Sequence, residues 1–331
     1  MKQRLAIAIA LSCMVGVIGC GNGDETAPPP SQPAPEETSP REGSRTRTSI
    51  RNAHLHVKEG VVLQIENLIG EIEGTRDDAP ATFDDPESFL IDIDSATVFM
   101  APSSLAALLN THVFAVPDAP IAKMEVTIEE GKLKQKGVLK KGVEVAFETE
   151  GQIRATPEGD ILVHTTSLKA AGLPVKGLLD FFGVEMEELI ESERARGLRV
   201  EGDDLILDPE EALPPPRVKG RITEARIEGS AIRLDFGDPR EAERELKPEG
   251  KEARNYLFFR GGALRFGKLT MRDSDLRLVD ADADDPFDFS LPQYNRHLVA
   301  GYSKNSSDYG LVVQMPDLGD IDETTDLRPG R

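Results

Sequence analysis

The sequence predicts an α+β fold, in which a long, curved antiparallel sheet wraps two amphipathic helices and is followed by a C-terminal β-rich extension. Three observations predict it. Apolar and polar residues alternate with period two along much of the chain, which is typical of half-buried strands. Short turn signals separate these runs and favour antiparallel pairs, because parallel pairs need a long crossover. Two segments instead carry apolar residues at helical spacing.

The first residues have the features of an export signal. Lys2 and Arg4 precede an apolar run, Leu5 to Ile18, which is shorter than the ~20 residues of a membrane-spanning helix but suits a signal peptide. The run ends at Gly19 and Cys20. Residues 17–20, Val-Ile-Gly-Cys, resemble the lipobox of bacterial lipoproteins, which implies that Cys20 is acylated and becomes the first residue after cleavage. An ordinary secretory signal with an incidental cysteine is the alternative.

Shifts in composition divide the rest of the chain. Residues that follow Cys20 are rich in Pro, Glu, Ser and Thr and cannot bury enough apolar surface to order, which predicts a flexible tether. The predicted parts are a signal peptide (1–19), lipidated Cys20 and tether (20–48), an α+β domain (49–237), a charged connector or surface helix (238–255), a β-rich extension (256–316) and a disordered tail (317–331).

The predicted strands are placed by alternation. In the main domain they include 124–129, 143–148 and 232–236, with turn signals at 130–132, 141–142, 157–160 and 228–230 between runs. In the extension we expect strand-like sequence at 256–259, 264–271, 276–279, 298–302 and 311–315. The close spacing of these runs predicts an antiparallel meander.

The two predicted helices cover 101–114 and 173–194. In the first, Ser103 or Ser104 can cap the N-terminus and His112 shares the apolar stripe as a half-buried packing residue. In the second, Pro174 suits the first turn and Gly183 weakens the middle.

The composition excludes some classes of function. The formal net charge is −20, and phosphates would be repelled by so acidic a body, which argues against binding nucleic acid. The chain has no Trp and 5% aromatic residues, so a stacking platform for sugars is not expected.

The order of predicted elements in residues 50–237 resembles the tubular lipid-binding superfamily, and within it the small lipid-binding proteins of the bacterial cell envelope. The likeness rests on "EEGKLKQKG", "VEVAFETEGQIRATPEGDILVHTTSLKAAGLPV" and "LPPPRVKGRITEARIEGSAIRLDF", with helices between. The extension after residue 255 departs from that pattern. The resemblance implies an apolar groove, and the alternative is that the same residues form a solid core. The groove candidates are Leu105, Leu108, Leu109, Val145, Phe147, Leu178, Phe181, Phe182, Met186 and Phe236.

Two segments contain residue types that bind metals. His54 and His56 share one face of a predicted edge strand and could hold zinc with a third ligand, although none is near in sequence. Asp280, Asp282 and Asp284 alternate as in a calcium loop, but the required glycine and glutamate positions hold other residues, so an irregular calcium site and a solvated acidic turn both stay open. No metal or cofactor is expected.

The sequence contains no catalytic motif such as a Gly-x-Ser-x-Gly elbow or HExxH. We therefore expect a non-enzymatic protein of the cell envelope that is held by its lipid anchor, on the outer membrane facing the periplasm in a diderm cell, and that binds a lipid or another apolar small molecule. The alternatives are an interaction lipoprotein with a solid core and an acidic docking surface for an unidentified protein partner, and, third, a hydrolase.

Overall fold

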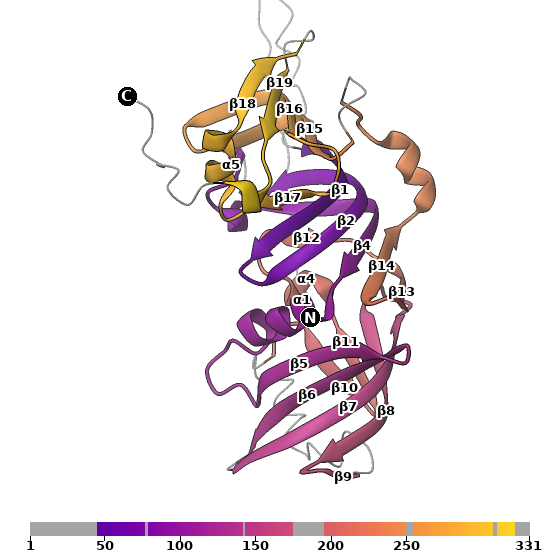
Figure 1. Cartoon of the computed structure of the whole chain (residues 1–331). Helices are drawn as coiled ribbons and strands as arrows, with labels where there is room; N and C mark the ends of the chain where they lie inside the picture. Colours follow the sequence, from indigo (N-terminus) through magenta and orange to yellow (C-terminus); the bar gives the residue numbers. More distant parts are fainter. Residues whose placement is uncertain are drawn as a thin grey trace, which may run out of the picture. The chain divides into compact units, whose positions relative to one another are not determined.

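A computed structural model describes residues 45–76, 79–141, 143–174, 195–248, 254–306 and 310–321. These residues belong to one compact unit, Pro40–Arg331, and are mainly strands arranged in two sheets (Figure 1). The β-rich character predicted from period-two alternation is therefore confirmed. The predicted signal peptide, Cys20 and most of the tether lie outside the described residues.

The first sheet has twelve strands among the described residues, in the order β13-β14-β4-β2-β1-β15-β16-β19-β18, with β12 beside β4, β17 beside β1 and β3 beside β15. Their bounds are β1 Arg45–Lys58, β2 Val61–Gly74, β3 Ala81–Thr82, β4 Phe89–Met100, β12 Arg217–Lys219, β13 Ile222–Glu228, β14 Ala231–Gly237, β15 Tyr256–Phe266, β16 Leu269–Asp280, β17 Phe287–Ser290, β18 Tyr302–Asn305 and β19 Leu311–Met315.

The second sheet has seven described strands in the order β10-β11-β8-β7-β6-β5, with β9 beside β8, and all its pairs are antiparallel. Their bounds are β5 Ile121–Glu129, β6 Lys132–Lys141, β7 Val143–Ala155, β8 Ile161–Ala170, β9 Leu173–Pro174, β10 Leu198–Glu201 and β11 Asp204–Leu207. Strands β5 to β8 are neighbours in chain order and form the meander that the closely spaced turn signals predicted, whereas the strand that continues the sheet beyond β8 is β11 and not β10.

The described helices are short. They are α1 Pro102–Leu108, α4 Pro209–Ala212 and α5 Tyr294–Ala300, the π-helical turn η2 Leu109–Val113, and the 3-10 turns η1 Pro86–Ser88, η3 Pro239–Arg244 and η4 Leu318–Asp320. The helix predicted at 101–114 is confirmed as α1 and η2, and α1 contacts β2 of the first sheet and β5 of the second (Figure 1). Residues 173–174, where the second predicted helix was expected to begin, form the short strand β9 instead. From residue 175 on, this predicted helix lies outside the described residues.

The prediction of a single antiparallel sheet is wrong in two respects. There are two sheets, and the first contains parallel pairs: β17 with β1, β12 with β4, β19 with β16 and β3 with β15. The crossover between β4 and β12 contains the whole second sheet, and the crossover between β16 and β19 contains α5. Because local turn signals report only neighbouring strands, they do not reveal pairings across such long insertions.

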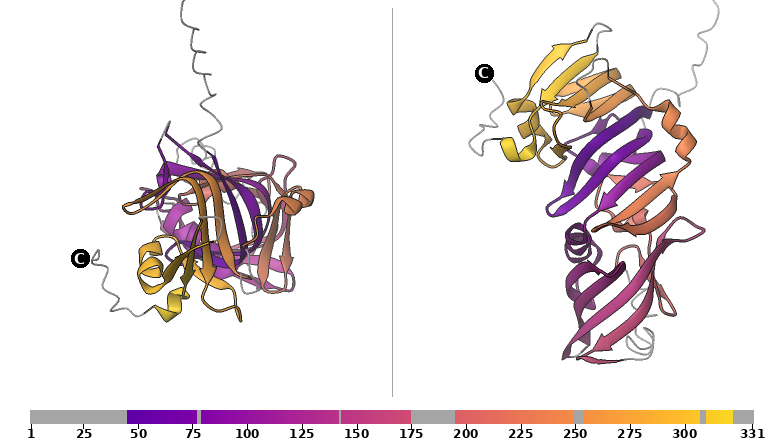
Figure 2. Two further views of the ribbon diagram at one scale, coloured as in Figure 1. Left: turned by 90° about the horizontal axis from the view of Figure 1, so that it is seen from above. Right: turned by 45° about the vertical axis from the view of Figure 1, so that its right-hand side comes forward.

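Residues 256–316 continue the first sheet, because β15 pairs with β1 between Arg47 and Arg51 (Figure 2). Three local expectations are also corrected. Strand β1 begins at Arg45, inside the predicted tether. The strand expected at 298–302 is largely helix α5, which ends at Ala300. The first residues of the predicted disordered tail include the turn η4, whereas residues 322–331 lie outside the described part.

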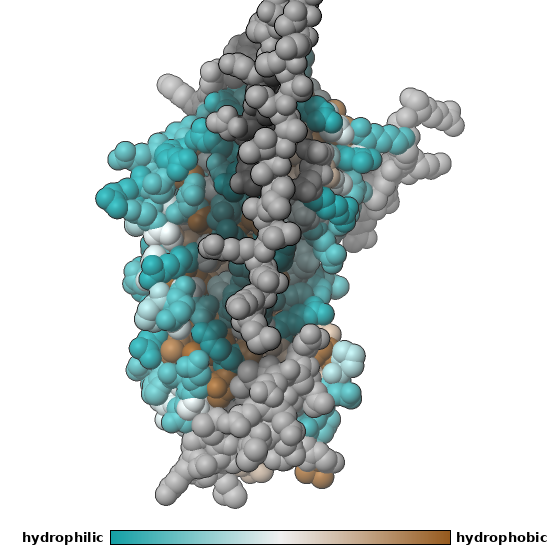
Figure 3. Space-filling model, turned by 180° about the vertical axis from the view of Figure 1, so that it is seen from behind, coloured by the Kyte–Doolittle hydropathy of each residue, from teal (hydrophilic) through white to brown (hydrophobic). Residues whose placement is uncertain are grey.

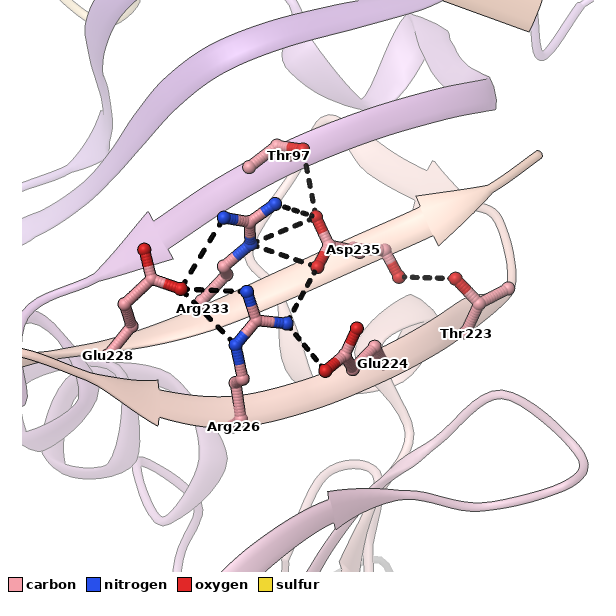
Figure 4. A network of polar contacts seen from close by, with 7 residues as sticks. All are labelled: Thr97, Thr223, Glu224, Arg226, Glu228, Arg233 and Asp235. Carbon is pink, nitrogen blue, oxygen red and sulfur yellow. Dashed lines mark hydrogen bonds and ion pairs between the residues drawn. The ribbon is translucent and has the colours of Figure 1, made fainter. Parts of the chain in front are cut away.

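The outer face of the first sheet is polar where β13, β14 and β4 meet. Arg226 and Arg233 lie opposite each other, and their like charges are balanced by Glu228 and Asp235 (Figure 4). Thr97 Oγ1 donates to Asp235 Oδ1 at 2.8 Å, which ties β4 into the same network. Strand β14 therefore presents charged residues to solvent and the alternate residues to the interior. The face seen in Figure 3 is mainly hydrophilic where its residues are described.

Candidate ligand cavity

An apolar cavity lies between the inner faces of the two sheets and against α1. About 130 Å³ of it can be occupied by the centre of a water-sized molecule, and its atom-free space, including solvent at its mouth, is about 1600 Å³. An apolar cavity of roughly 150 Å³ in another protein stays dry and takes up benzene. This cavity therefore has room for part of an apolar molecule in the structure as it stands.

Both sheets contribute apolar side chains to the wall. From the first sheet these include Leu55, Leu63, Ile65, Ile91, Ile93, Ile232, Leu234 and Phe236, and from the second Ile121, Met124, Leu133, Phe147, Ile153 and Val163. Among the described residues, no charged side chain lines the cavity, and the lining side chains with polar groups are those of Gln135 and Thr149. An apolar molecule in this cavity would be stabilised by the apolar area removed from water, about 25 cal/mol per Å².

The sequence of β6 explains how one strand builds this wall. The lysines at 132, 134, 136 and 140 alternate with residues 133, 135, 137 and 139, which are buried. Gly137 lies opposite Phe147, and a Cβ at position 137 would come within 2.8 Å of the Phe147 ring. The missing side chain at position 137 therefore leaves the space that the Phe147 ring occupies against the cavity.

A side-chain amide attaches the helical segment to the second sheet. Asn110 Nδ2 donates to the Met124 carbonyl at 2.7 Å, and the Met124 N–H donates to Asn110 Oδ1 at 2.9 Å. These bonds satisfy backbone groups of β5 where its register with β6 shifts between Ala122 and Glu125. The segment that carries Leu105, Leu108 and Leu109 is thereby held against β5, and all three leucines line the cavity.

Five predicted groove residues line the cavity: Leu105, Leu108, Leu109, Phe147 and Phe236. Val145 is half-buried and is not part of the lining, because β7 reaches the cavity only from Phe147 onward. Leu178, Phe181, Phe182 and Met186 lie outside the described residues.

Sequence reasoning missed the contribution of the first sheet. Ile50 and Leu55 in β1, Leu63 and Ile65 in β2, and Ile93 in β4 line the cavity. The alternation at 61–65, Val-Val-Leu-Gln-Ile, and at 91–93, Ile-Asp-Ile, was a usable signal for half-buried strands.

Among the described residues, the histidines do not come together with other ligands of a metal ion. His56 Nε2 lies 2.5 Å from Asp288 Oδ1, and burial lowers the pKa of His54. Both belong to β1, which is paired on both sides, so the expected edge strand is wrong. Burial, together with the nearby positive charges of Arg196 and Lys58, lowers the pKa of His112 to about 4. His112 Nδ1 accepts from Arg196 Nη1 at 3.2 Å, and the residue is buried rather than half-buried as predicted.

An acidic cluster forms at the end of β16. Asp280, Asp282 and Asp317 each offer a carboxylate oxygen, and these oxygens lie within 4.8 Å of one another. Asp284, the third residue of the predicted alternating set, is not in the cluster. Its N–H donates to Asp282 Oδ1 in a tight turn, whereas Asp317 comes from beyond β19. Burial raises the pKa of Asp280, and burial with the charges of Asp280, Asp285 and Asp288 raises that of Asp317 to about 6.

The raised pKa of Asp317 predicts a dependence of stability on pH. Its value of about 6 in the folded state exceeds that of an unfolded aspartate, about 3.9. The stabilisation from its protonation is thus complete below pH ~4 and is lost as the pH rises through 6. Asp317→Asn keeps the acceptor for the Asp288 N–H and should raise the free energy of unfolding at pH 7 by about 1 kcal/mol, after allowance for solvent screening.

Urea unfolding of the two proteins at pH 4 and pH 7 measures this effect. The stability difference should be present at pH 7 and absent at pH 4. Asp282→Asn, which removes an exposed carboxylate from the same cluster, should change the pH profile less. A difference between wild type and Asp317→Asn that is equal at both pH values would contradict the prediction.

The function of the chain has to be inferred from its own sequence and structure, and above all from this cavity. No protein-family model, curated protein or solved structure matches the chain. None of the described helices has the length and apolar character needed to cross a bilayer.

Proposed function

We propose that this chain is a lipid-anchored protein of the bacterial cell envelope whose body binds or carries a lipid or another apolar ligand, without catalysis. The observation that carries the proposal is the apolar cavity between the two sheets, because a solid core would leave no such space. Protein interiors are otherwise close-packed, and voids larger than a water molecule are few. A concave site with an almost wholly apolar wall and a few polar groups is typical of ligand sites.

The wall and the surface support separate parts of the proposal. The wall includes five of the residues predicted from the resemblance to tubular lipid-binding proteins, and α1 contacts both sheets, as one of the two amphipathic helices expected there. The chain carries a formal net charge of −20, which disfavours adsorption of the body to anionic lipid. The lipobox-like sequence at residues 17–20 would keep the body close to a bilayer that supplies the ligand.

Native mass spectrometry of the full chain, released from membranes in a mild detergent, tests ligand binding. We expect the protein with a bound apolar molecule, released as the collision energy is raised. A protein that is ligand-free after this treatment, and that also fails to take up added diphenylhexatriene, would overturn the proposal and favour the interaction lipoprotein with a closed core.

The anchor gives a separate prediction. The variant Cys20→Ser lacks the sulfur that would receive the diacylglyceryl group, so its membrane-bound fraction should fall from nearly all of the protein to a small part. Fractionation in high salt measures this, because salt removes proteins held only by charge. Cys13→Ser, which changes the other cysteine, is the control and should stay with the membrane. Equal membrane association of both variants would remove the anchor from the proposal.

A further inference from the structure

The cavity wall contains one polar spot. Gln135 of β6 and Thr149 of β7 lie directly opposite each other in the antiparallel ladder and both line the cavity. Their exposed fractions are 7% and 4%, so more than nine-tenths of each residue is buried. Residues at the neighbouring inward positions, Leu133 and Phe147, are apolar. The spot therefore interrupts an otherwise apolar wall on two adjacent strands.

No hydrogen bond joins either side chain to another described residue. Neither is among the unpaired polar atoms that the protein encloses fully, so their polar groups face the space of the cavity. The Gln135 amide offers two donors and an acceptor, and the Thr149 hydroxyl offers one donor and can also accept. Burying such groups unpaired is unfavourable, and buried polar groups in folded proteins are nearly always satisfied. An apolar residue of similar size at either position would stabilise the empty protein. The polar pair is therefore better explained by a bound group than by packing.

The chemistry of that group follows from the charges around it. No charged side chain lines the cavity in the described part of the chain, and the protein is strongly acidic. A carboxylate or phosphate at this depth would be a buried charge without a counter-ion, which is far less favourable than a neutral polar group. The amide N–H and hydroxyl donors suit an uncharged acceptor such as an ester carbonyl.

We propose that the ligand is a neutral lipid ester whose carbonyl oxygen accepts hydrogen bonds from Gln135 and Thr149, while its hydrocarbon contacts the apolar wall. This inference rests on the proposed function and deepens it, since it names the class of ligand. The carbonyl would satisfy groups that the protein leaves unpaired and would fix the depth of the ligand between the sheets. A hydrocarbon without a polar group would bind the same wall but leave the pair unsatisfied.

Three fluorescent probes, each titrated into the full chain, separate the contribution of the ester group to binding from that of the hydrocarbon. Parinaric acid methyl ester carries a neutral ester, parinaric acid carries a carboxylate on the same chain, and diphenylhexatriene carries no polar group. We expect the methyl ester to bind at least about tenfold more tightly than the acid at pH 7. The variants Gln135→Met and Thr149→Val keep the side-chain size and remove the donors. Each should weaken binding of the ester about 3- to 10-fold and leave binding of diphenylhexatriene unchanged or tighter.

The outcomes distinguish the two proposals. If the wild type binds none of the probes, the proposed function fails. If diphenylhexatriene binds but neither variant changes the affinity for the ester, the pair holds water instead, and the inference fails while the proposed function stands. If a variant loses the same affinity for the ester and for diphenylhexatriene, the inference is also overturned, because such a loss would indicate a general disturbance of the cavity wall. Circular dichroism and Thr149→Ser, which keeps the hydroxyl and should retain most ester binding, exclude misfolding as the cause.

Discussion

Ile153→Trp should lower the affinity for an apolar ligand about tenfold or more while leaving the fold intact. Ile153 lines the cavity from β7 and is only partly buried, so an indole there can extend into the open space. A bulky side chain that removes about 60 Å² of apolar contact with the ligand makes binding less favourable by about 1.5 kcal/mol. The dissociation constant then rises roughly tenfold. Titration with diphenylhexatriene measures the change.

The chain provides its own spectroscopic control for this experiment. It contains no Trp, so the introduced indole is the single emitter of its kind. Its emission should be blue-shifted and should be quenched when a brominated fatty acid ester enters the cavity. Arg154→Trp places the same side chain one residue further along β7, on the opposite face, where the native side chain is 65% exposed. That variant should emit at longer wavelength and bind normally. Equal affinities for the two variants would contradict the position of the ligand.

Gly237→Ala should produce the largest loss of stability among the changes considered, about 3–4 kcal/mol. Gly237 ends β14 with φ +63°, a left-handed conformation that costs a residue with a Cβ about 1–2 kcal/mol. An added Cβ would also lie 1.8 Å from the Asp94 carbonyl oxygen of β4, a contact that requires the backbone to shift and adds about 2 kcal/mol. Because Gly237 pairs with Ser95, this shift would disturb the β14–β4 ladder that carries Phe236 into the cavity wall.

Gly229→Ala isolates the cost of the backbone conformation. Gly229 lies in the turn between β13 and β14 with φ +61°, and an added Cβ would meet no atom within 4 Å. Its substitution should cost only about 1–2 kcal/mol. Guanidinium unfolding of both variants and the wild type measures the difference. Equal losses for Gly229→Ala and Gly237→Ala would show that the β4 backbone does not restrict position 237.

The parts of the fold that the sequence predicts are those set by local patterns. Alternation located β5, β7 and β14, and the apolar stripe of residues 101–114 located α1 and η2, because period and face are properties of one element. The pairing of β1 with β15 joins residues about 200 positions apart and leaves no signal in turns. The parallel pair of β12 and β4 is concealed for the same reason, since the second sheet is inserted between them.

The candidate site was predictable to the same degree. Residues on the inward face of a predicted element, such as Leu108 and Phe147, could be identified because they are large, apolar and correctly spaced. Val145 has the same pattern but lies beyond the part of β7 that the cavity reaches, and a single strand cannot reveal where a cavity ends. Gln135 has a weak sequence signal, because a polar residue within "KLKQKG" looks like another solvated position unless its alternation with the lysines is considered.

The position of β1 has a mechanical consequence. Its first residue, Arg45, leads directly into a strand that pairs with β2 along one edge and with β15 and β17 along the other. Any pull transmitted along the preceding chain therefore loads an internal strand lengthwise, and the bonds on both of its edges must give way together. Hydrogen bonds loaded together in shear resist force better than bonds broken one after another when an outer strand is peeled away. The sheet should therefore withstand a force applied at its N-terminal side.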